Sequence, residues 1–150
     1  MSEKDTQEMR ELFLFELMTD DDLQALMPIL REKFYGAGTK IFSEKERGET
    51  MFVIKKGSVK IVKQDGDVQK ELITFSAGDF FGEVTLFEYA MRTASAFAVE
   101  DTTLLEIART DFTKLFSQKP QVTAKILFQM MTEMSRRLRR KNMPSGGLIL

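Results

Sequence analysis

The chain has 150 residues, with 22 Lys plus Arg against 23 Asp plus Glu, and it contains neither cysteine nor histidine. It therefore lacks the usual ligands of a zinc site, an iron–sulfur cluster or a haem, and the groups of a Ser-His-Asp or Cys-His catalytic system. We expect one globular domain that holds none of these cofactors and is not an enzyme. The formal net charge of −1 argues against direct binding to nucleic acid.

The N-terminal region predicts helices. Residues 1–11 form a polar segment without the order of a secretory signal, and no apolar run approaches the ~18 residues of a membrane span. We therefore expect a cytoplasmic protein with no membrane contact. From Leu12 to Arg31 apolar residues recur at helical spacing, with a break near Thr19. Thr19 and the three aspartates after it predict the N-cap and first turn of a second short helix.

The region from about residue 34 to residue 108 has the pattern of a β domain. Glycines separate short runs rich in Val, Ile, Phe and Thr, which is typical of antiparallel strands. The pair Asp65-Gly66 predicts a hairpin turn. The clearest strands are 50–54, 58–62, 68–75, 94–99 and 103–107. Roughly eight strands between terminal helices predict a mainly β fold with flanking helices, an antiparallel β jelly-roll barrel with N-terminal helices and a long C-terminal helix.

The C-terminal helix is expected over residues 120–141, with Pro120 at its first position. Two apolar stripes run along it, one of Val122, Ile126 and Met130 and one of Ala124, Leu127, Met131, Met134 and Leu138. One stripe can pack on the barrel and the other on a partner helix, so the pattern predicts a homodimer through this helix. Residues 142–150 are expected to form a flexible tail that is too short for a helix-turn-helix.

The segment Gly78-Asp79-Phe80-Phe81-Gly82-Glu83-Val84-Thr85-Leu86-Phe87, followed by Met91-Arg92-Thr93-Ala94, has the chemistry of an anion site. A short helical turn after a glycine leaves backbone N–H groups unsatisfied, which suits a phosphate. Arg92 can bind the same phosphate through two hydrogen bonds, and the Glu83 carboxylate suits a sugar hydroxyl. Taken singly, Glu83 is also explained as an acid at the positive end of a helix, and Arg92 as a surface ion pair. Together they favour a singly charged phosphate beside a free ribose hydroxyl.

From about Leu12 to Lys141 the sequence resembles the cyclic nucleotide-binding domain family, the type found in the catabolite activator protein and the kinase A regulatory subunits. The segment just described carries the resemblance, and Gly48-Glu49-Thr50-Met51-Phe52-Val53-Ile54-Lys55-Lys56-Gly57 supports it. Because few residues follow the last helix, we expect a stand-alone sensor domain without a DNA-binding half.

The resemblance implies a phosphate-binding cassette that begins at Phe81. Glu83 would bind the ribose 2′-OH and Arg92 the cyclic phosphate. The phosphate oxygens would also meet Gly82 and the amides near Val84 and Thr85.

The resemblance also implies residues around the base. Ile61 and Leu72 match the family's apolar wall, although such residues on strands are core more often than pocket. Thr93 can bond a guanine amino group, but members with Ser or Thr at this place also take cyclic AMP, so the base stays open between cyclic AMP and cyclic GMP.

Three positions depart from the family pattern, which usually has Ala or Gly at Thr85, Pro at Met91 and Gly at Lys45. Thr85 adds bulk near the phosphate amides, and Met91 leaves its loop less rigid. These departures imply a lower affinity rather than a different fold.

The stretch Arg136-Arg137-Leu138-Arg139-Arg140-Lys141 places five positive charges in six residues. They complement the C-terminus of a helix, or one of them, assigned to Arg137, closes over the bound base as a cation–π lid. A nucleic-acid patch is the third reading.

We thus expect an allosteric sensor that signals through its C-terminal helix to a downstream protein that the sequence does not name. The alternative is a degenerate nucleotide-binding fold that serves as a protein interaction or dimerisation module without ligand.

Overall fold

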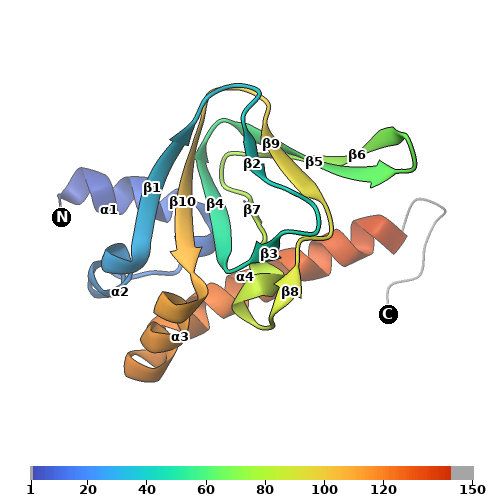
Figure 1. Cartoon of the computed structure of the whole chain (residues 1–150). Helices are drawn as coiled ribbons and strands as arrows, with labels where there is room; N and C mark the ends of the chain where they lie inside the picture. Colours follow the sequence, from blue (N-terminus) through green and yellow to red (C-terminus); the bar gives the residue numbers. More distant parts are fainter. Residues whose placement is uncertain (1, 143–150) are drawn as a thin grey trace.

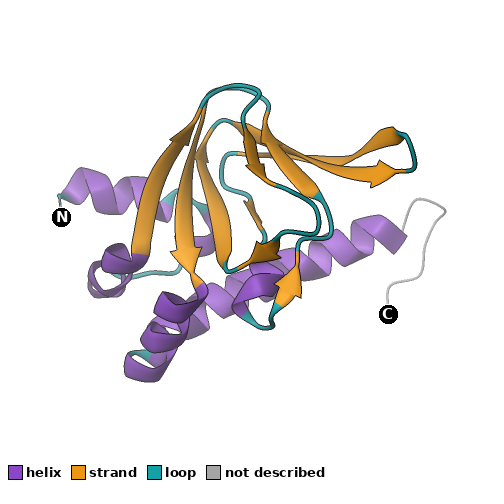
Figure 2. Cartoon of the chain, in the orientation of Figure 1, coloured by secondary structure: helices purple, strands orange, loops and turns teal. Residues whose placement is uncertain are grey.

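The computed structural model describes residues 2–142. Figure 2 shows the strands grouped in one body with the helices along one side of it. The elements in chain order (Figure 1) are α1 (Glu3–Arg10), η1 (Phe13–Phe15), α2 (Asp20–Leu26), η2 (Met27–Ile29), β1 (Leu30–Tyr35), β2 (Lys40–Phe42), β3 (Arg47–Gly48), β4 (Thr50–Lys56), β5 (Ser58–Asp65), β6 (Val68–Ser76), β7 (Phe80–Phe81), η3 (Glu83–Leu86), β8 (Ala90–Met91), β9 (Ser95–Ala98), β10 (Thr102–Ala108), α3 (Arg109–Gln118) and α4 (Pro120–Asn142). The predicted tail, residues 142–150, lies outside the described residues except for Asn142.

Two four-stranded antiparallel sheets form the body. Their strand orders are β1-β10-β4-β7 and β2-β9-β5-β6, and β3 pairs separately with β8. Side chains from both sheets share one core cluster, made of Tyr35, Phe52, Ile54, Val59, Phe75, Phe81, Ala96, Ala98 and Leu104. These observations confirm the predicted fold class, a mainly β jelly-roll type with flanking helices. The strands are hydrogen-bonded as separate sheets rather than as one closed barrel.

Each of the five strands expected from sequence is present, as β4, β5, β6, β9 and β10. The predicted hairpin turn also forms, because Asp65 pairs with Val68 across it and Gly66 has a φ of 64°. The β5–β6 hairpin projects from the body (Figure 1). Its root carries one wall of the cavity described below.

The N-terminal region differs from the expectation in two ways. Residues 1–11 were expected only as a polar segment, but Ser2 and Asp5 form a capping box that starts α1, and Met9 is buried in the core. The helical pattern expected from Leu12 to Arg31 resolves into η1, α2 and η2, and Leu30 already begins β1. The chain leaves the helical pattern there because Leu30 pairs with β10, a partner that helical spacing does not reveal.

The predicted N-cap at Thr19 is confirmed. Its side chain accepts a hydrogen bond from the Asp22 amide, and the Asp22 carboxylate accepts one from the Thr19 amide. Sequence analysis missed α3, which packs through Phe112 and Leu115. The prediction therefore succeeded for α2, whose first turn is fixed by local hydrogen bonds, and failed for α3, which is held by packing.

Helix α4 has two faces. Val122, Ile126 and Met130 are buried against the body, as the pattern predicted for one stripe. On the opposite face, Phe128, Met131 and Leu138 are 65%, 68% and 57% exposed. Leu127 of the other predicted stripe is instead partly buried against the core, so Phe128 takes its place on the exposed face. Polar contacts fix the buried face: Lys125 pairs with Asp22 of α2, and the Gln129 side-chain amide donates to the Phe13 carbonyl at 2.9 Å.

Candidate functional site

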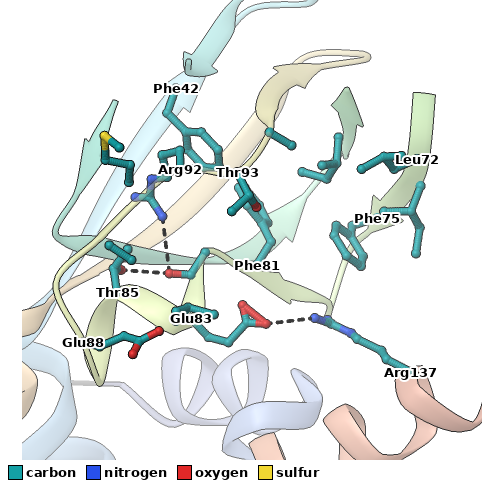
Figure 3. A pocket seen from close by; sticks show the side chains of 17 residues that line it. Phe42, Leu72, Phe75, Phe81, Glu83, Thr85, Glu88, Arg92, Thr93 and Arg137 are labelled. Carbon is teal, nitrogen blue, oxygen red and sulfur yellow. Dashed lines mark hydrogen bonds and ion pairs between the residues drawn. The ribbon is translucent and has the colours of Figure 1, made fainter. Parts of the chain in front are cut away.

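A cavity of about 390 Å³ lies between the β5–β6 hairpin, the segment 81–94 and α4 (Figure 3). The structure places every predicted ligand-site residue on its wall: Ile61, Leu72, Phe81, Gly82, Glu83, Val84, Thr85, Arg92, Thr93 and Arg137. Sequence analysis did not assign to the site the other wall residues, which are Phe42, Ile73, Phe75, Glu88, Ala90, Met91 and Ala94. The structure thus brings the predicted set together, while the role of each residue remains a prediction.

Arg92 follows β8 and is 9% exposed. Its Nη2 donates to the Thr50 carbonyl at 2.7 Å and its Nη1 to the Gly82 carbonyl at 3.4 Å. Burial lowers the pKa of Arg92, and the Glu46 and Glu83 carboxylates act in the opposite direction. None of the ion pairs among the described residues includes Arg92. An arginine stays protonated even so, and a buried cation without an anionic partner suits an anionic ligand.

Gly82 forms the sharp turn into η3. Its φ of 74° lies in the left-handed region, which glycine adopts without steric cost. A Cβ at this position would lie 2.8 Å from Nη1 of Arg92. Thr85 is 3% exposed, and its hydroxyl donates to the Gly82 carbonyl at 2.9 Å. The Thr85 hydroxyl therefore stabilises the turn at Gly82, and the missing side chain of Gly82 leaves space for Arg92.

Glu83 and Arg137 connect the cassette to α4. Nη1 of Arg137 lies 3.4 Å from Oε1 of Glu83, and the two side chains are 16% and 13% exposed. Nη2 of Arg137 donates to the Phe80 carbonyl at 2.6 Å, and Nε donates to Glu133 at 3.0 Å. Figure 3 shows Arg137 reaching from α4 towards Glu83 at the edge of the cavity. Glu83, the residue predicted to bind the ribose, is thus already paired with a residue of α4.

The hairpin side of the cavity is apolar. Ile61 of β5 pairs in register with Ile73 of β6, and Leu72 and Ile73 are 49% and 41% exposed. Phe75 lies deeper, with the Arg137 guanidinium 4.6 Å from its ring centroid. A planar ring can therefore rest on this wall. Thr93 stands across the cavity from it, beside Arg92 (Figure 3).

Within residues 2–142, no cluster of three or more potential metal ligands has the geometry to hold an ion. No helix in this part of the chain is long and apolar enough to cross a membrane.

Known proteins are similar to this chain in sequence and in fold. A family model described as "Cyclic nucleotide-binding domain" matches residues 32–119. The Cyclic AMP receptor protein of Thermus thermophilus is 29% identical over 110 residues, which are 73% of this chain and 51% of that protein. Human cGMP-dependent protein kinase 2 is 34% identical over 107 residues, 69% of this chain and 14% of the kinase. The crystal structure of the Thermus thermophilus catabolite activator protein superimposes with a TM-score of 0.75 and 26% identity, over 87% of this chain and 60% of that one.

A β body with an arginine-bearing cavity and a long helix against it defines a ligand-binding domain. The matched residues show which kind: the chain belongs to the cyclic nucleotide-binding domain family. This family binds cyclic AMP or cyclic GMP. The chain spans about half the length of the bacterial relative and a small part of the kinase.

Proposed function

We propose that the chain binds cyclic AMP or cyclic GMP in this cavity and acts as a regulatory module that signals through α4. The observation that carries the proposal is Arg92, a buried guanidinium on the cavity wall that has no carboxylate partner within the described residues. A cyclic phosphodiester supplies one negative charge, which is what this cation lacks. A charged partner in so buried a place forms strong hydrogen bonds.

The remaining roles follow from position. Glu83 accepts a hydrogen bond from the ribose 2′-OH, while Gly82 lets the backbone approach the phosphate. The base rests against Ile61 and Leu72. Thr93 lies beside the arginine and offers a hydroxyl to the base, which is compatible with either nucleotide.

The module regulates rather than catalyses, and we place it in the cytoplasm, where a chain without cysteine is at no disadvantage. The matched relatives support a regulatory role. One is named as a receptor, and in the cGMP-dependent kinase the match covers only 14% of the length. A downstream protein receives the signal from α4.

Thermal unfolding with cyclic AMP, cyclic GMP and 5′-AMP tests ligand binding. A ligand present at a hundred times its Kd adds about 2.7 kcal/mol to the free energy of unfolding, which raises Tm by roughly 5 to 10 °C in a chain of this size. We expect this rise with a cyclic nucleotide and none with 5′-AMP, whose phosphate carries a second charge. The absence of any shift at millimolar nucleotide, with protein shown to be free of bound ligand, would favour the alternative of an interaction module.

Signalling through α4 depends on the Arg137–Glu83 pair. A ribose hydroxyl that bonds Glu83 competes with Arg137 for the same carboxylate, so binding changes what holds the end of α4. The guanidinium keeps its contacts with the Phe80 carbonyl and Glu133. Its released Nη1 then lies near the base, where the group can act as a cation–π lid. Ligand occupancy and helix position are therefore linked through one side chain.

Replacing Arg137 by methionine should uncouple α4 from the cavity. We expect cyclic nucleotide affinity to stay within about tenfold of wild type, because Arg92 and Glu83 remain and the lost cation–π lid contributes only about 1 kcal/mol. Hydrogen exchange of peptides covering residues 130–140 should change on ligand addition in the wild type and not in the variant. Arg139→Met, a neighbour without a contact to the cassette, serves as the matched control. A full ligand response in Arg137→Met would contradict this role.

A second copy of the chain is the partner that we propose for the exposed face of α4. Ala124, Phe128, Met131, Ser135 and Leu138 recur at alternating steps of four and three along this face, which is the spacing of a two-helix seam. All five are exposed. The opposite face already packs on the body, so the helix has one face for each neighbour.

The double substitution Met131→Glu and Leu138→Glu should abolish the dimer. Four carboxylates facing one another across a seam repel, and burying them is costly. Sedimentation should show monomers at concentrations where the wild type dimerises. Val99→Glu, a substitution of another exposed apolar residue, should leave the dimer intact. Equal association of both variants would exclude this seam.

A further inference from the structure

The aromatic ring of Phe42 lies over the arginine of the site. Phe42 ends β2, and the Arg92 guanidinium carbon is 4.1 Å from its ring centroid. The Phe52 ring is farther from the same carbon, at 5.7 Å. Figure 3 shows the Phe42 ring directly beside the guanidinium, on the side of the cavity away from Glu83.

We infer that Phe42 is a positioning residue that holds Arg92 in place for the phosphate through its ring face, an inference that rests on the proposed function. The negative face of an aromatic ring attracts a guanidinium, and the attraction is larger when water is excluded. Arg92 is 9% exposed, so this contact is largely desolvated. The ring takes the place that a carboxylate holds beside most buried arginines.

A ring suits this position better than a carboxylate would. A carboxylate at ion-pair distance would neutralise Arg92 and compete with the phosphate. An aromatic face stabilises the cation without supplying a formal charge, so the guanidinium keeps its charge for the ligand. The two carbonyl acceptors, at Thr50 and Gly82, likewise carry no formal charge.

The Phe42 ring is itself held in place. Its centroid lies 5.8 Å from that of Phe52 and 6.0 Å from that of Phe81, with tilted planes, which is a favourable range for aromatic pairs. Phe52 and Phe81 stack on each other at 5.0 Å. The arginine therefore rests on a supported ring, and little of its freedom has to be lost when a phosphate binds.

Fluorinated phenylalanine at position 42 tests this inference, because fluorine weakens the negative ring face with little change of shape. We would incorporate 4-fluoro- and 3,4,5-trifluorophenylalanine and measure Kd for cyclic AMP and cyclic GMP by calorimetry. The inference requires Kd to rise with each added fluorine, by about tenfold for the trifluoro ring, consistent with a desolvated cation–π contact. Trifluorophenylalanine at Phe112, a buried residue of α3, should leave Kd unchanged. A Kd within twofold of wild type for both position-42 variants would overturn the inference.

A second measurement needs no ligand. The effect of trifluorophenylalanine 42 on urea unfolding is compared in chains with Arg92 and with Arg92→Met. We expect destabilisation with Arg92 and none with methionine, so the two changes couple. Equal effects in both backgrounds would overturn the inference even if nucleotide binds. Coupling in a chain that binds no cyclic nucleotide would instead retain the Phe42–Arg92 contact and reject the proposed function.

Discussion

Replacing Arg92 by methionine is expected to weaken cyclic nucleotide binding by about 100-fold or more. Truncating one partner of a buried, hydrogen-bonded charge pair costs about 2 to 5 kcal/mol, and a hundredfold in Kd corresponds to about 2.7 kcal/mol. Methionine fills much of the arginine's space but donates no hydrogen bond and carries no charge. Calorimetry with cyclic AMP and cyclic GMP measures the loss directly.

Two further variants give this prediction its controls. Arg92→Lys keeps the charge without the planar pair of donors, so it should lose less affinity than methionine. Arg92→Ala removes the bulk of the side chain as well as its charge and should abolish binding. Circular dichroism of the three variants without ligand should show a folded chain with a lowered Tm, because the contacts of Arg92 are lost while the core clusters keep all their residues. Unchanged affinity in Arg92→Met would refute the assignment of the phosphate site.

The substitution Gly48→Ala should reduce nucleotide affinity by roughly 30- to 100-fold while the chain still folds. A Cβ on Gly48 would lie 2.5 Å from Cζ and Nε of Arg92 and 2.6 Å from Cγ2 of Thr85. Both groups belong to buried side chains, so the guanidinium has to move to make room for the methyl group, and this movement also costs some stability. A guanidinium moved away from the phosphate loses part of the about 2 to 5 kcal/mol that separates an intact buried charge pair from a truncated one.

Gly36→Ala is the matched control for Gly48→Ala. It adds the same methyl group on the same body, where the nearest side-chain atom would be Oγ1 of Thr39 at an ordinary 3.7 Å. We expect its Kd to equal that of the wild type. If Gly48→Ala also bound nucleotide normally, Arg92 would have to bind its ligand from a different position.

Some of the site is readable from sequence because it is continuous in the chain. Gly82, Glu83 and Arg92 lie on one short segment of the chain, so spacing and chemistry alone predicted an anion site. The family resemblance added Ile61, Leu72 and Arg137. The structure places all of these on one cavity. What spacing could not supply is the contact between Arg137 and Glu83, since 54 positions separate them.

Phe42 was missed for a similar physical reason. It lies on a three-residue strand, too short for alternation to indicate which face is buried. Its place over Arg92 is set by the pairing of β2 with β9, in which Phe42 faces Ala96. Helix α1 was missed because its residues are mostly polar, although the Ser2 and Asp5 capping box is a local signal that could have revealed it.

Thr85 illustrates a different limit. Its bulk next to the phosphate amides was expected to lower affinity, and this expectation stays a prediction. The structure shows what the side chain does without ligand, where its hydroxyl closes the turn onto Gly82. A residue type alone gives the volume of a side chain but not the bond that directs it.

Arg137 and Leu138 are consecutive residues that point to different neighbours. The first contacts Glu83 at the cavity, and the second is 57% exposed on the proposed seam. In the proposed dimer, nucleotide binding and association of the chains are linked, and such linkage acts in both directions. Nucleotide affinity would therefore depend on the concentration of the chain itself. A dilute cell and a crowded one would then respond at different nucleotide levels, and the amount of chain made would set the threshold of the response.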